Sequence, residues 1–405
     1  MNTSAPERRR SLVTLQDIFQ LGDPEYACTH PLPAHVRKAA RAIMPCRTAV
    51  LGGHGHACPD GHISRIWYNS CRHRAGPQCA FIQVERWLAT QRARLLACDH
   101  SPVIVTIPHD LNPRWRENVP LMTALLLQTV RDTLTTLLAD PKDLGAQPGI
   151  IAALHTWGQT LVLHPHIHCL VPGGGLTADG QWQAVRNGCL VPVRVAMAIF
   201  RGKFRAALRT AWPRDTLQLP EDLRPQAFLN LLNRLGHPQQ TRGNVHMQER
   251  SPHGTGVATY LARDMRGGPI KTPRLVACDG ETVTLRYIEN HGQAAEASGR
   301  QQQMTLPIGD FLQRVLQHVP PPGTQVVRSW GLSPTRHAAA LPVCRAPLGQ
   351  APVVLPVRLD GPTVCAQRGD ARPAQCPLCG QLLACTMVLP RGGVSPPASS
   401  PERAA

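Results

Sequence analysis

The sequence is poor in aromatic residues and has no long apolar run. Phe, Trp and Tyr make up 4% of its 405 residues. Any chemistry that needs a phenol must therefore use one of four tyrosines, Tyr26, Tyr68, Tyr260 or Tyr287. No apolar stretch reaches the roughly eighteen residues that a transmembrane helix needs, and the first residues lack the apolar centre of a signal peptide. We therefore expect a cytoplasmic protein.

Acidic residues are also scarce, which leaves a strong positive charge. Lys and Arg number 43 against 26 Asp and Glu, for a formal net charge of +17. Such a charge indicates a polyanionic partner, with nucleic acid as the first candidate. A helix predicted over residues 193–212 carries Arg201, Lys203 and Arg205 and no acidic residue. This imbalance favours a phosphate-contacting surface over an ordinary solvated face.

Cysteine and histidine are concentrated between residues 46 and 79, where little apolar sequence is available to form a core. This composition is typical of a small domain held together by zinc. The expected ligands are two pairs, Cys58 with His62 and Cys71 with Cys79. Further candidates are Cys46, His54, His56 and His73. The alternative is a loop without metal, because no Cys-x-x-Cys fixes the ligand spacing in this segment.

A Cys-x-x-Cys does occur near the C-terminus, at Cys376 and Cys379. It has the form of half a zinc-ribbon knuckle, and Cys344, Cys365 or Cys385 could complete it. The surrounding sequence is rich in Pro and Arg, and its last residues are typical of a disordered tail.

The segment from His164 to Gly175 contains His164, His166 and His168 and ends in three glycines. With the apolar residues 160–163 before it, the segment predicts a buried strand. Residues two apart share one face of a strand, so His166 and His168 should lie side by side while Ile167 enters the core. Two neutral imidazoles on one rigid strand form half of a metal site. The alternative is a hydrogen-bonded pair on the face of a sheet.

A second strand is predicted over residues 150–157, only two residues before the histidine strand begins. Two strands joined so closely predict an antiparallel hairpin. This hairpin brings His155 or Gln159 near the histidine pair as a third ligand, and His164 is a further possibility. A strand over residues 102–108 and helices over 120–138 and 225–235 complete the pattern.

A helix predicted over residues 255–265 places Tyr260, Arg263 and Asp264 on one face. A tyrosine on a helix more often packs than reacts, so the residue pattern alone assigns Tyr260 no role.

Four blocks of the chain, in order, resemble the rolling-circle transposases of bacterial insertion sequences, the IS-ninety-one and ISCR group. The blocks span residues 69–79, 154–175, 256–270 and 318–331. The resemblance implies an α+β fold, in which a HUH-type antiparallel sheet is flanked by helices, preceded by a small zinc-binding domain and followed by a Pro/Arg-rich C-terminal region. The expected organisation is a helical lead-in over 1–40, a zinc-binding and DNA-contacting domain over 41–97, the HUH nuclease domain over 98–300, an extension over 301–345 and a partly disordered tail over 346–405.

The resemblance also implies an activity and a set of partners. A member of this group is a metal-dependent nickase and strand transferase that cuts and rejoins single-stranded DNA at the ends of its element. By this resemblance Tyr260 is the nucleophile that forms a 5′-phosphotyrosine, and Arg263 could hold the phosphate. His166 and His168 would bind Mg²⁺ or Mn²⁺, and the N-terminal domain would bind Zn²⁺. The expected partners are single-stranded element ends and target DNA, in the cytoplasm of a bacterium and associated with its nucleoid.

Two positions depart from the pattern of the group. Asp264 stands where some relatives carry a second tyrosine, which predicts a single-tyrosine enzyme. Gly76 stands where relatives carry the first cysteine of Cys-Pro-x-Cys, so one expected zinc ligand is missing unless His73 replaces it. Two alternative functions follow from the same residues. The chain could be a non-catalytic zinc-dependent DNA-binding protein, such as an element-end repressor or an inactive copy, or a zinc hydrolase that uses His166 and His168.

Overall fold

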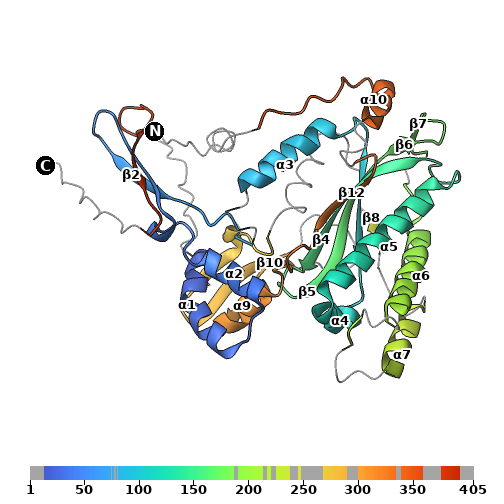
Figure 1. The fold of residues 1–405 in the computed structure, drawn as a ribbon, viewed down its shortest axis with the longest axis horizontal. Coiled ribbons are helices and arrows are strands. Elements are labelled where there is room, and N and C mark those ends of the chain that lie inside the picture. The colour runs from blue at the N-terminus through green and yellow to red at the C-terminus, as the bar shows by residue number, and fades with distance from the viewer. Residues whose placement is uncertain are drawn as a thin grey trace. The chain divides into compact units, whose positions relative to one another are not determined.

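The computed structural model describes residues 13–73, 75–76, 79, 81–186, 190–212, 217–219, 225–237, 245–247, 268–289, 300–333, 339–358 and 375–392. The chain forms two compact units (Figure 1). The first unit contains residues up to 85, residues 268–319 and the chain from 358 onwards, and the second contains residues 86–267 and 320–357. Each unit is therefore assembled from segments that are far apart in the sequence.

The α-helices in the described part of the first unit are α1 (Leu15–Thr29), α2 (Ala34–Ile43) and α9 (Ile308–Leu316). Thr14 and Asp17 cap α1 reciprocally: the Asp17 N–H donates to Thr14 Oγ1 at 3.3 Å, and the Thr14 N–H donates to Asp17 Oδ2 at 2.9 Å. Such a box satisfies two of the helix's free donors. Gly22 allows α1 and α9 to pack closely, because a Cβ at this position would lie 2.7 Å from Cγ1 of Ile308 in α9. The antiparallel sheet β9 (Leu275–Cys278), β10 (Thr282–Glu289) and β11 (Arg300–Pro307) completes this part.

A second small sheet of the first unit joins both ends of the chain. Its order is β13-β1-β2, with β1 (Gly53–Ala57) in the centre between β2 (Ser64–Tyr68) and β13 (Ala384–Leu389). Both pairings are antiparallel. Few side chains of this sheet are buried, so its apolar core is small.

The second unit is built on a larger sheet with the order β7-β6-β4-β5-β3-β8, in which β12 also pairs with β4. All its pairings are antiparallel. Its strands are β3 (His100–Thr106), β4 (Gln147–Trp157), β5 (Leu163–Pro172), β6 (Gly174–Leu176), β7 (Trp182–Ala184), β8 (Val245–Met247) and β12 (Val327–Gly331). Its helices are α3 (Phe81–Arg94, mostly in this unit), α4 (Asn112–Glu117), α5 (Val119–Ala139), α6 (Val193–Ala211), α7 (Pro225–Leu235) and α10 (Ala340–Arg345). The expected α+β class with an antiparallel sheet flanked by helices is confirmed.

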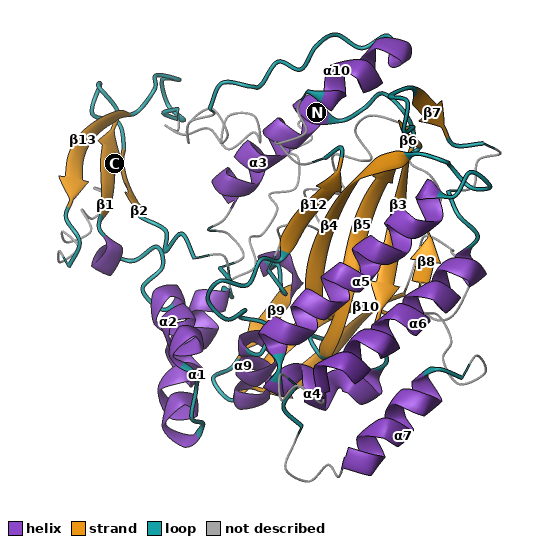
Figure 2. Ribbon diagram, turned by 45° about the vertical axis from the view of Figure 1, so that its right-hand side comes forward, coloured by secondary structure: helices purple, strands orange, loops and turns teal. Residues whose placement is uncertain are grey.

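The main core lies between one face of this sheet and the helices α5, α6 and α7, and α5 and α6 run across that face in Figure 2. Ile167 of β5 and Phe200 of α6 belong to this core and are almost fully buried. The opposite face carries a smaller apolar cluster, in which Leu88 of α3 packs with Ala153 and Leu170. The two faces of β5 therefore have different surroundings.

The central hairpin differs from the prediction at its turn. β4 ends at Trp157 and β5 begins at Leu163, so the connection is five residues long, and the prediction that residues 160–162 continue the strand is wrong. The Gly158 N–H donates to the Val162 carbonyl at 3.1 Å, and Leu161 adopts a φ of +62°. A left-handed residue is incompatible with a strand, although the segment is as apolar as one.

The other predicted elements of the second unit are present. The strand over 102–108 is β3, and the helices over 120–138, 193–212 and 225–235 are α5, α6 and α7. The predicted helix over 255–265 and the last residues of the tail lie outside the described residues. The division of the chain into five segments stays a prediction.

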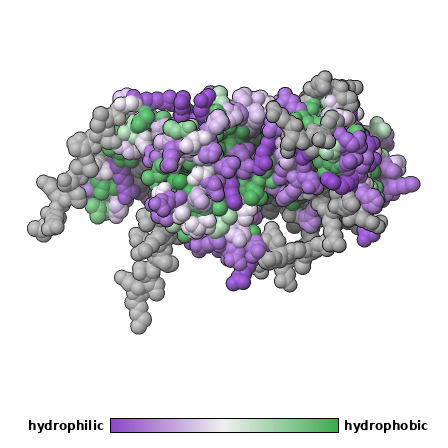
Figure 3. All heavy atoms as spheres, turned by 90° about the horizontal axis from the view of Figure 1, so that it is seen from below, coloured by the Kyte–Doolittle hydropathy of each residue, from purple (hydrophilic) through white to green (hydrophobic). Residues whose placement is uncertain are grey.

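Among the described helices, none is long and apolar enough to cross a membrane. On the side drawn in Figure 3, hydrophilic and hydrophobic residues are intermixed.

Candidate metal centre and nucleic-acid interface

Three histidines of the central hairpin come together on the sheet face opposite the main core. His155 of β4 pairs directly with His166 of β5, and His168 follows on the same side of β5. The Nε2 atoms of His166 and His168 lie 3.0 Å apart, and the ring centroid of His155 lies 4.6 Å from that of His168. Each ring offers a nitrogen within 4.8 Å of the others. Ile167 points into the core, as the strand periodicity predicts.

A backbone hydrogen bond orients the central imidazole. Nδ1 of His166 lies 2.7 Å from the carbonyl oxygen of His164, to which only a protonated Nδ1 can donate. In the neutral ring, Nε2 of His166 is then unprotonated, and its lone pair is directed toward His168. Hydrogen bonds of this type fix the tautomer of metal-binding histidines. The unprotonated Nε2 of His166 can accept a hydrogen bond from Nε2 of His168 or bind a metal ion, so this geometry fits both a hydrogen-bonded pair and a set of metal ligands.

His155 favours the set of metal ligands. Its Nε2 is buried and has no hydrogen-bond partner among the residues that the structure describes, although buried polar groups are nearly always satisfied. The indole of Trp157 stacks on its ring at 4.5 Å between centroids. A divalent ion bound by three imidazole nitrogens would satisfy this atom, so the residues present fit a metal.

Burial keeps these imidazoles neutral, which is the form that binds metal. Desolvation lowers the pKa of His155 well below its usual value, with the neighbouring His168 and His166 adding to the effect. It also lowers the pKa of His166, and it lowers the pKa of His168 to about 3, again with a contribution from His166. No carboxylate joins the histidine cluster among the described residues.

His164 occupies a different position from the one expected of a ligand. It lies on the same side of β5, but its Nδ1 is 2.9 Å from Nε2 of His109, and it does not join His155, His166 and His168 in the group that could hold a metal ion. No local sequence signal indicated His109, which follows β3 in a short 3-10 turn. Only the pairing of β3 with β5 brings it close. Gln159, the other candidate third ligand, lies in the turn of the hairpin.

Among the described residues of the first unit, the metal-ligand candidates fall into two groups rather than one. Cys46, Cys71 and Cys79 lie together, with Sγ of Cys46 3.2 Å from Sγ of Cys79. Cys58 and His62 are grouped instead with Cys376 and Cys379. The expectation of one site made by Cys58, His62, Cys71 and Cys79 is therefore corrected: the pairing of β13 with β1 brings the C-terminal knuckle to the first pair.

The group formed by Cys46, Cys71 and Cys79 has the electrostatics of a thiolate site. Hydrogen bonds from the thiols of Cys71 and Cys79 lower the pKa of Cys46 to about 3. The same interactions raise the pKa values of Cys71 and Cys79, because these thiols donate to the Cys46 sulfur. One negative charge is thus already favoured without metal. Gly76 borders the group, since a Cβ on it would lie 3.1 Å from Sγ of Cys79.

Among the described residues, the side chains of His54, His56 and His73 do not join either cysteine group, although the His73 N–H donates to Sγ of Cys71 at 3.5 Å. His54 and His56 lie on β1, and His56 packs edge-on against Trp67. Nδ1 of His73 accepts a hydrogen bond from the Ala75 N–H at 3.2 Å. These contacts do not favour His73 as the replacement for a ligand at Gly76.

The cationic helix α6 packs on the core face of the sheet, opposite to the histidine cluster. The ammonium group of Lys203 donates to the Asp132 carbonyl at 2.9 Å and to Thr136 Oγ1 at 2.8 Å. Nε of Arg201 donates to the Met197 carbonyl at 3.3 Å. A strand of DNA bound at the histidines would therefore have to pass around the sheet to contact these cations.

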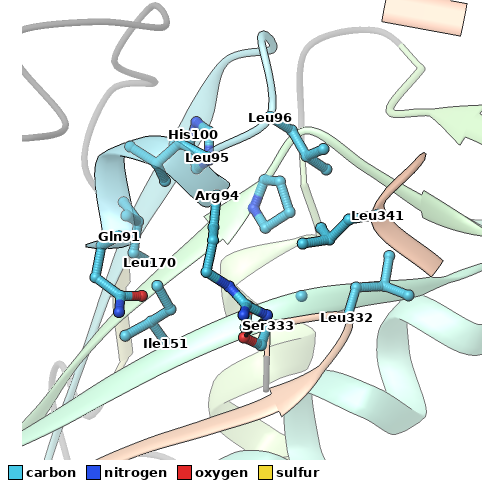
Figure 4. Close-up of a pocket in the computed structure, with 12 residues that line it drawn as sticks. Gln91, Arg94, Leu95, Leu96, His100, Ile151, Leu170, Leu332, Ser333 and Leu341 are labelled. Atoms are coloured by element: carbon cyan, nitrogen blue, oxygen red, sulfur yellow. Dashed lines mark hydrogen bonds between the residues drawn. The ribbon is translucent and has the colours of Figure 1, made fainter. Parts of the chain in front are cut away.

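A small cavity of about 40 Å³ lies near α3, β4 and β5. Arg94 extends into it and donates to the Ser333 carbonyl at 3.1 Å (Figure 4). Its walls are mainly apolar, including Ile151, Leu170 and Leu341. No histidine of the cluster lines this cavity, so it is separate from the candidate metal centre.

Tyr260 and Arg263 lie outside the described residues. Their expected roles rest on the sequence resemblance.

Comparisons with known proteins decide the family. Residues 149–339 match the family described as "Putative transposase", and residues 18–107 match the "Transposase zinc-binding domain" of the IS91 type. The chain is 35% identical over 397 residues to "Putative transposase y4qJ" of Sinorhizobium fredii, covering 96% of this chain and 98% of that protein. The chain belongs to the IS91-type family of insertion-sequence transposases. It is also 26% identical to the "Transposase for insertion sequence element IS801" of Pseudomonas savastanoi, over 86% of this chain and 82% of that protein.

No solved structure matches this transposase. The match to the family model over 149–339 includes the whole histidine hairpin from Gly149 to Pro172, and the zinc-binding match includes Cys46, Cys71 and Cys79. The expected transposase function and the expected zinc-binding domain are confirmed at the level of the family.

Proposed function

We propose that this transposase nicks and rejoins single-stranded DNA at the ends of its element, with Tyr260 as nucleophile and with Mg²⁺ or Mn²⁺ held by His155, His166 and His168. The observation that carries the proposal is the histidine cluster. Three neutral imidazoles converge on one rigid hairpin, and the buried Nε2 of His155 lacks a partner. When bound there, a divalent ion would offset the charge of the scissile phosphate and orient it.

The chain's own residues supply the remaining chemistry. The phenol oxygen of Tyr260 attacks phosphorus and loses its proton, the bond to the 3′ oxygen breaks, and a 5′-phosphotyrosine and a free 3′-OH result. A free phenol has a pKa near 10, so the proton must leave during attack. Arg263 follows Tyr260 by three residues and would neutralise the phosphate. Attack by a 3′-OH on the phosphotyrosine reverses the step and rejoins DNA without a nucleotide cofactor.

Each chain would form one covalent intermediate with DNA at a time. Asp264 stands at the position of the second tyrosine of some relatives, so strand exchange between two tyrosines of one chain is not available. The zinc-binding domain and the cations Arg201, Lys203 and Arg205 would then serve to bind DNA rather than to cut it.

Covalent capture tests this proposal. The protein is incubated with Mn²⁺ and a labelled single-stranded element end, and the adduct is resolved under denaturing conditions. We expect an adduct with the wild type and none with Tyr260→Phe. Tyr287→Phe is the matched control, because Tyr287 lies on β10 in the other unit. Tight binding of the element end without any adduct would favour the non-catalytic DNA-binding alternative and refute the enzyme proposal.

A pair of variants tests the third ligand. His155→Ala should weaken Mn²⁺ binding at least about tenfold and reduce adduct formation, because loss of even a supporting partner of a metal site has an effect of this size. Gln159→Ala should leave both nearly unchanged. The opposite ranking would show that the turn, rather than β4, completes the site. Hydrolysis of DNA that survives Tyr260→Phe but not His166→Ala would instead support a zinc hydrolase.

A further inference from the structure

Two short turns that are more than 300 residues apart in the sequence meet in the first unit. The first, Cys58-Pro-Asp-Gly-His62, connects β1 and β2, and the second, Cys376-Pro-Leu-Cys379-Gly380, precedes β13. We propose that Cys58, His62, Cys376 and Cys379 form a zinc site that fastens the C-terminal segment to the N-terminal hairpin. The matched zinc-binding family model ends at residue 107, so it does not include the second turn.

Both turns close with a backbone hydrogen bond to the carbonyl of their first cysteine and contain a glycine with a positive φ, although the first bond spans three residues and the second spans four. In the first, the Gly61 N–H donates to the Cys58 carbonyl at 2.9 Å, and Gly61 has a φ of +76°. In the second, the Gly380 N–H donates to the Cys376 carbonyl at 2.8 Å, and Gly380 has a φ of +75°. A residue with a side chain adopts this conformation at a cost, whereas glycine does so freely. Each turn thus presents two ligands from a defined loop, as zinc knuckles do.

The distances fit tetrahedral zinc. Sγ of Cys58 lies 3.5 Å from Nδ1 of His62 and 3.5 Å from Sγ of Cys379, and Sγ of Cys376 lies 3.8 Å from Nδ1 of His62. A tetrahedron with Zn–S bonds of about 2.3 Å and a Zn–N bond of about 2.0 Å has edges of roughly 3.5–3.8 Å. The sulfur atoms are too far apart for a disulfide, whose S–S bond is about 2.05 Å.

The small sheet needs such a site because it has little core of its own. Cys58, Cys376 and Leu383 are its buried apolar cluster, with Ile63 and Trp67 partly buried against them. Val388 of β13 is 68% exposed. A core of this size cannot offset the loss of chain entropy, whereas a structural zinc ion contributes its binding free energy to folding.

Polar contacts around the cluster support the same role. The side-chain amide of Gln381 donates to Asp60 Oδ2 at 3.0 Å, which links the two turns directly. His62 and Cys379 are exposed, so the ion would lie near the surface and be open to chelators.

Alkylation mapping of the wild-type protein tests the site without any substitution. The zinc-loaded full-length chain is treated with a thiol reagent, and modified cysteines are identified by mass spectrometry. Cys379 and Cys385 are both exposed. We expect Cys385 to react at once and Cys379 to be protected until a chelator is added. Equal rates for the two cysteines in the zinc-loaded protein would overturn the proposal.

Metal counting gives an independent answer. The double variant Cys376→Ser/Cys379→Ser should contain one zinc fewer per chain than the wild type, while Cys385→Ser keeps the full count. Cys379→His should retain the ion, because it restores four ligands. A double variant with the same zinc content as the Cys385→Ser control would refute the site.

Insertion of a protease site between residues 361 and 370 tests whether the C-terminal segment is attached to the N-terminal hairpin. After cleavage, the C-terminal fragment should remain bound to the rest of the chain and dissociate on chelation. Release of the fragment in the presence of zinc would contradict the proposed attachment.

Discussion

Metal binding at the histidine cluster should be insensitive to acidification. An ordinary imidazole with a pKa of about 6.5 is neutral in only about one molecule in eleven at pH 5.5, so three such ligands would lose roughly a thousandfold in metal affinity between pH 7.5 and 5.5. In this transposase, burial lowers the pKa of His168 to about 3. The pKa values of His155 and His166 are lowered in the same direction by burial. Protons should therefore compete weakly, and we expect the affinity to fall less than about tenfold over this range.

The assay titrates Mn²⁺ into the Tyr260→Phe variant and measures binding by electron paramagnetic resonance. This variant is used because it keeps the proposed ligands but lacks the proposed nucleophile. The chain with His168→Ala serves as the control for binding elsewhere. A fall of more than about a hundredfold between pH 7.5 and 5.5 would show that the imidazoles titrate as exposed groups do, and the burial argument would be refuted.

Three further predictions follow. Without metal, the pKa of His168 is lower in the folded chain than in the unfolded chain, so the unfolded chain binds more protons below about pH 6.5. The free energy of unfolding should therefore be highest above that pH and fall as the pH is lowered, by up to about 1.4 kcal/mol per pH unit for His168. Thermal unfolding at pH 7.5 and 5.5, with and without Mn²⁺, measures this fall. Gly76→Cys should add a fourth thiolate beside Cys79 and slow zinc loss to a chelator, whereas Gly76→Ser should not. Replacing Arg201 and Arg205 with Gln should reduce by about 1.4 the slope of log affinity for single-stranded DNA against log salt concentration. The cleavage rate at saturating DNA should not fall, since α6 lies on the face of the sheet opposite the histidine cluster. An unchanged slope would show that these two residues do not contact DNA.

The second unit was largely predictable because its signals are local. Alternation along β5 placed His166 and His168 on one face and Ile167 on the other, and the short separation of β4 from β5 predicted the hairpin. His155 emerged as a candidate because the predicted hairpin lays its strand beside the histidine strand, but the register that places His155 opposite His166 was not predicted. The turn itself was misread, since Leu161 and Val162 are apolar but belong to the connection. Hydrophobicity alone does not show where a strand stops.

The cysteine groups were not predictable in the same way. The partners of Cys58 and His62 stand more than 300 residues later, and no periodicity in the sequence encodes the pairing of β1 with β13. The Cys-x-x-Cys at Cys376 was recognisable, but the spacing of its cysteines indicates only two ligands of a site and not which residues supply the other two. His109 was missed for the same reason, because it comes close to His164 only through the pairing of β3 with β5.

The proposed sites predict different metals for the two units. Both sites of the first unit are rich in thiolates, which select zinc among the common divalent ions and bind it in a closed shell. The site of the second unit offers three imidazoles without a thiolate, and such a set leaves coordination positions open for water or a phosphate oxygen. A brief treatment with a weak chelator should therefore remove Mn²⁺ or Mg²⁺ and abolish covalent capture of DNA while zinc remains bound. Capture restored by Mn²⁺ alone would assign the histidine cluster to cutting and the cysteine sites to structure. Capture restored only by zinc would reverse that assignment.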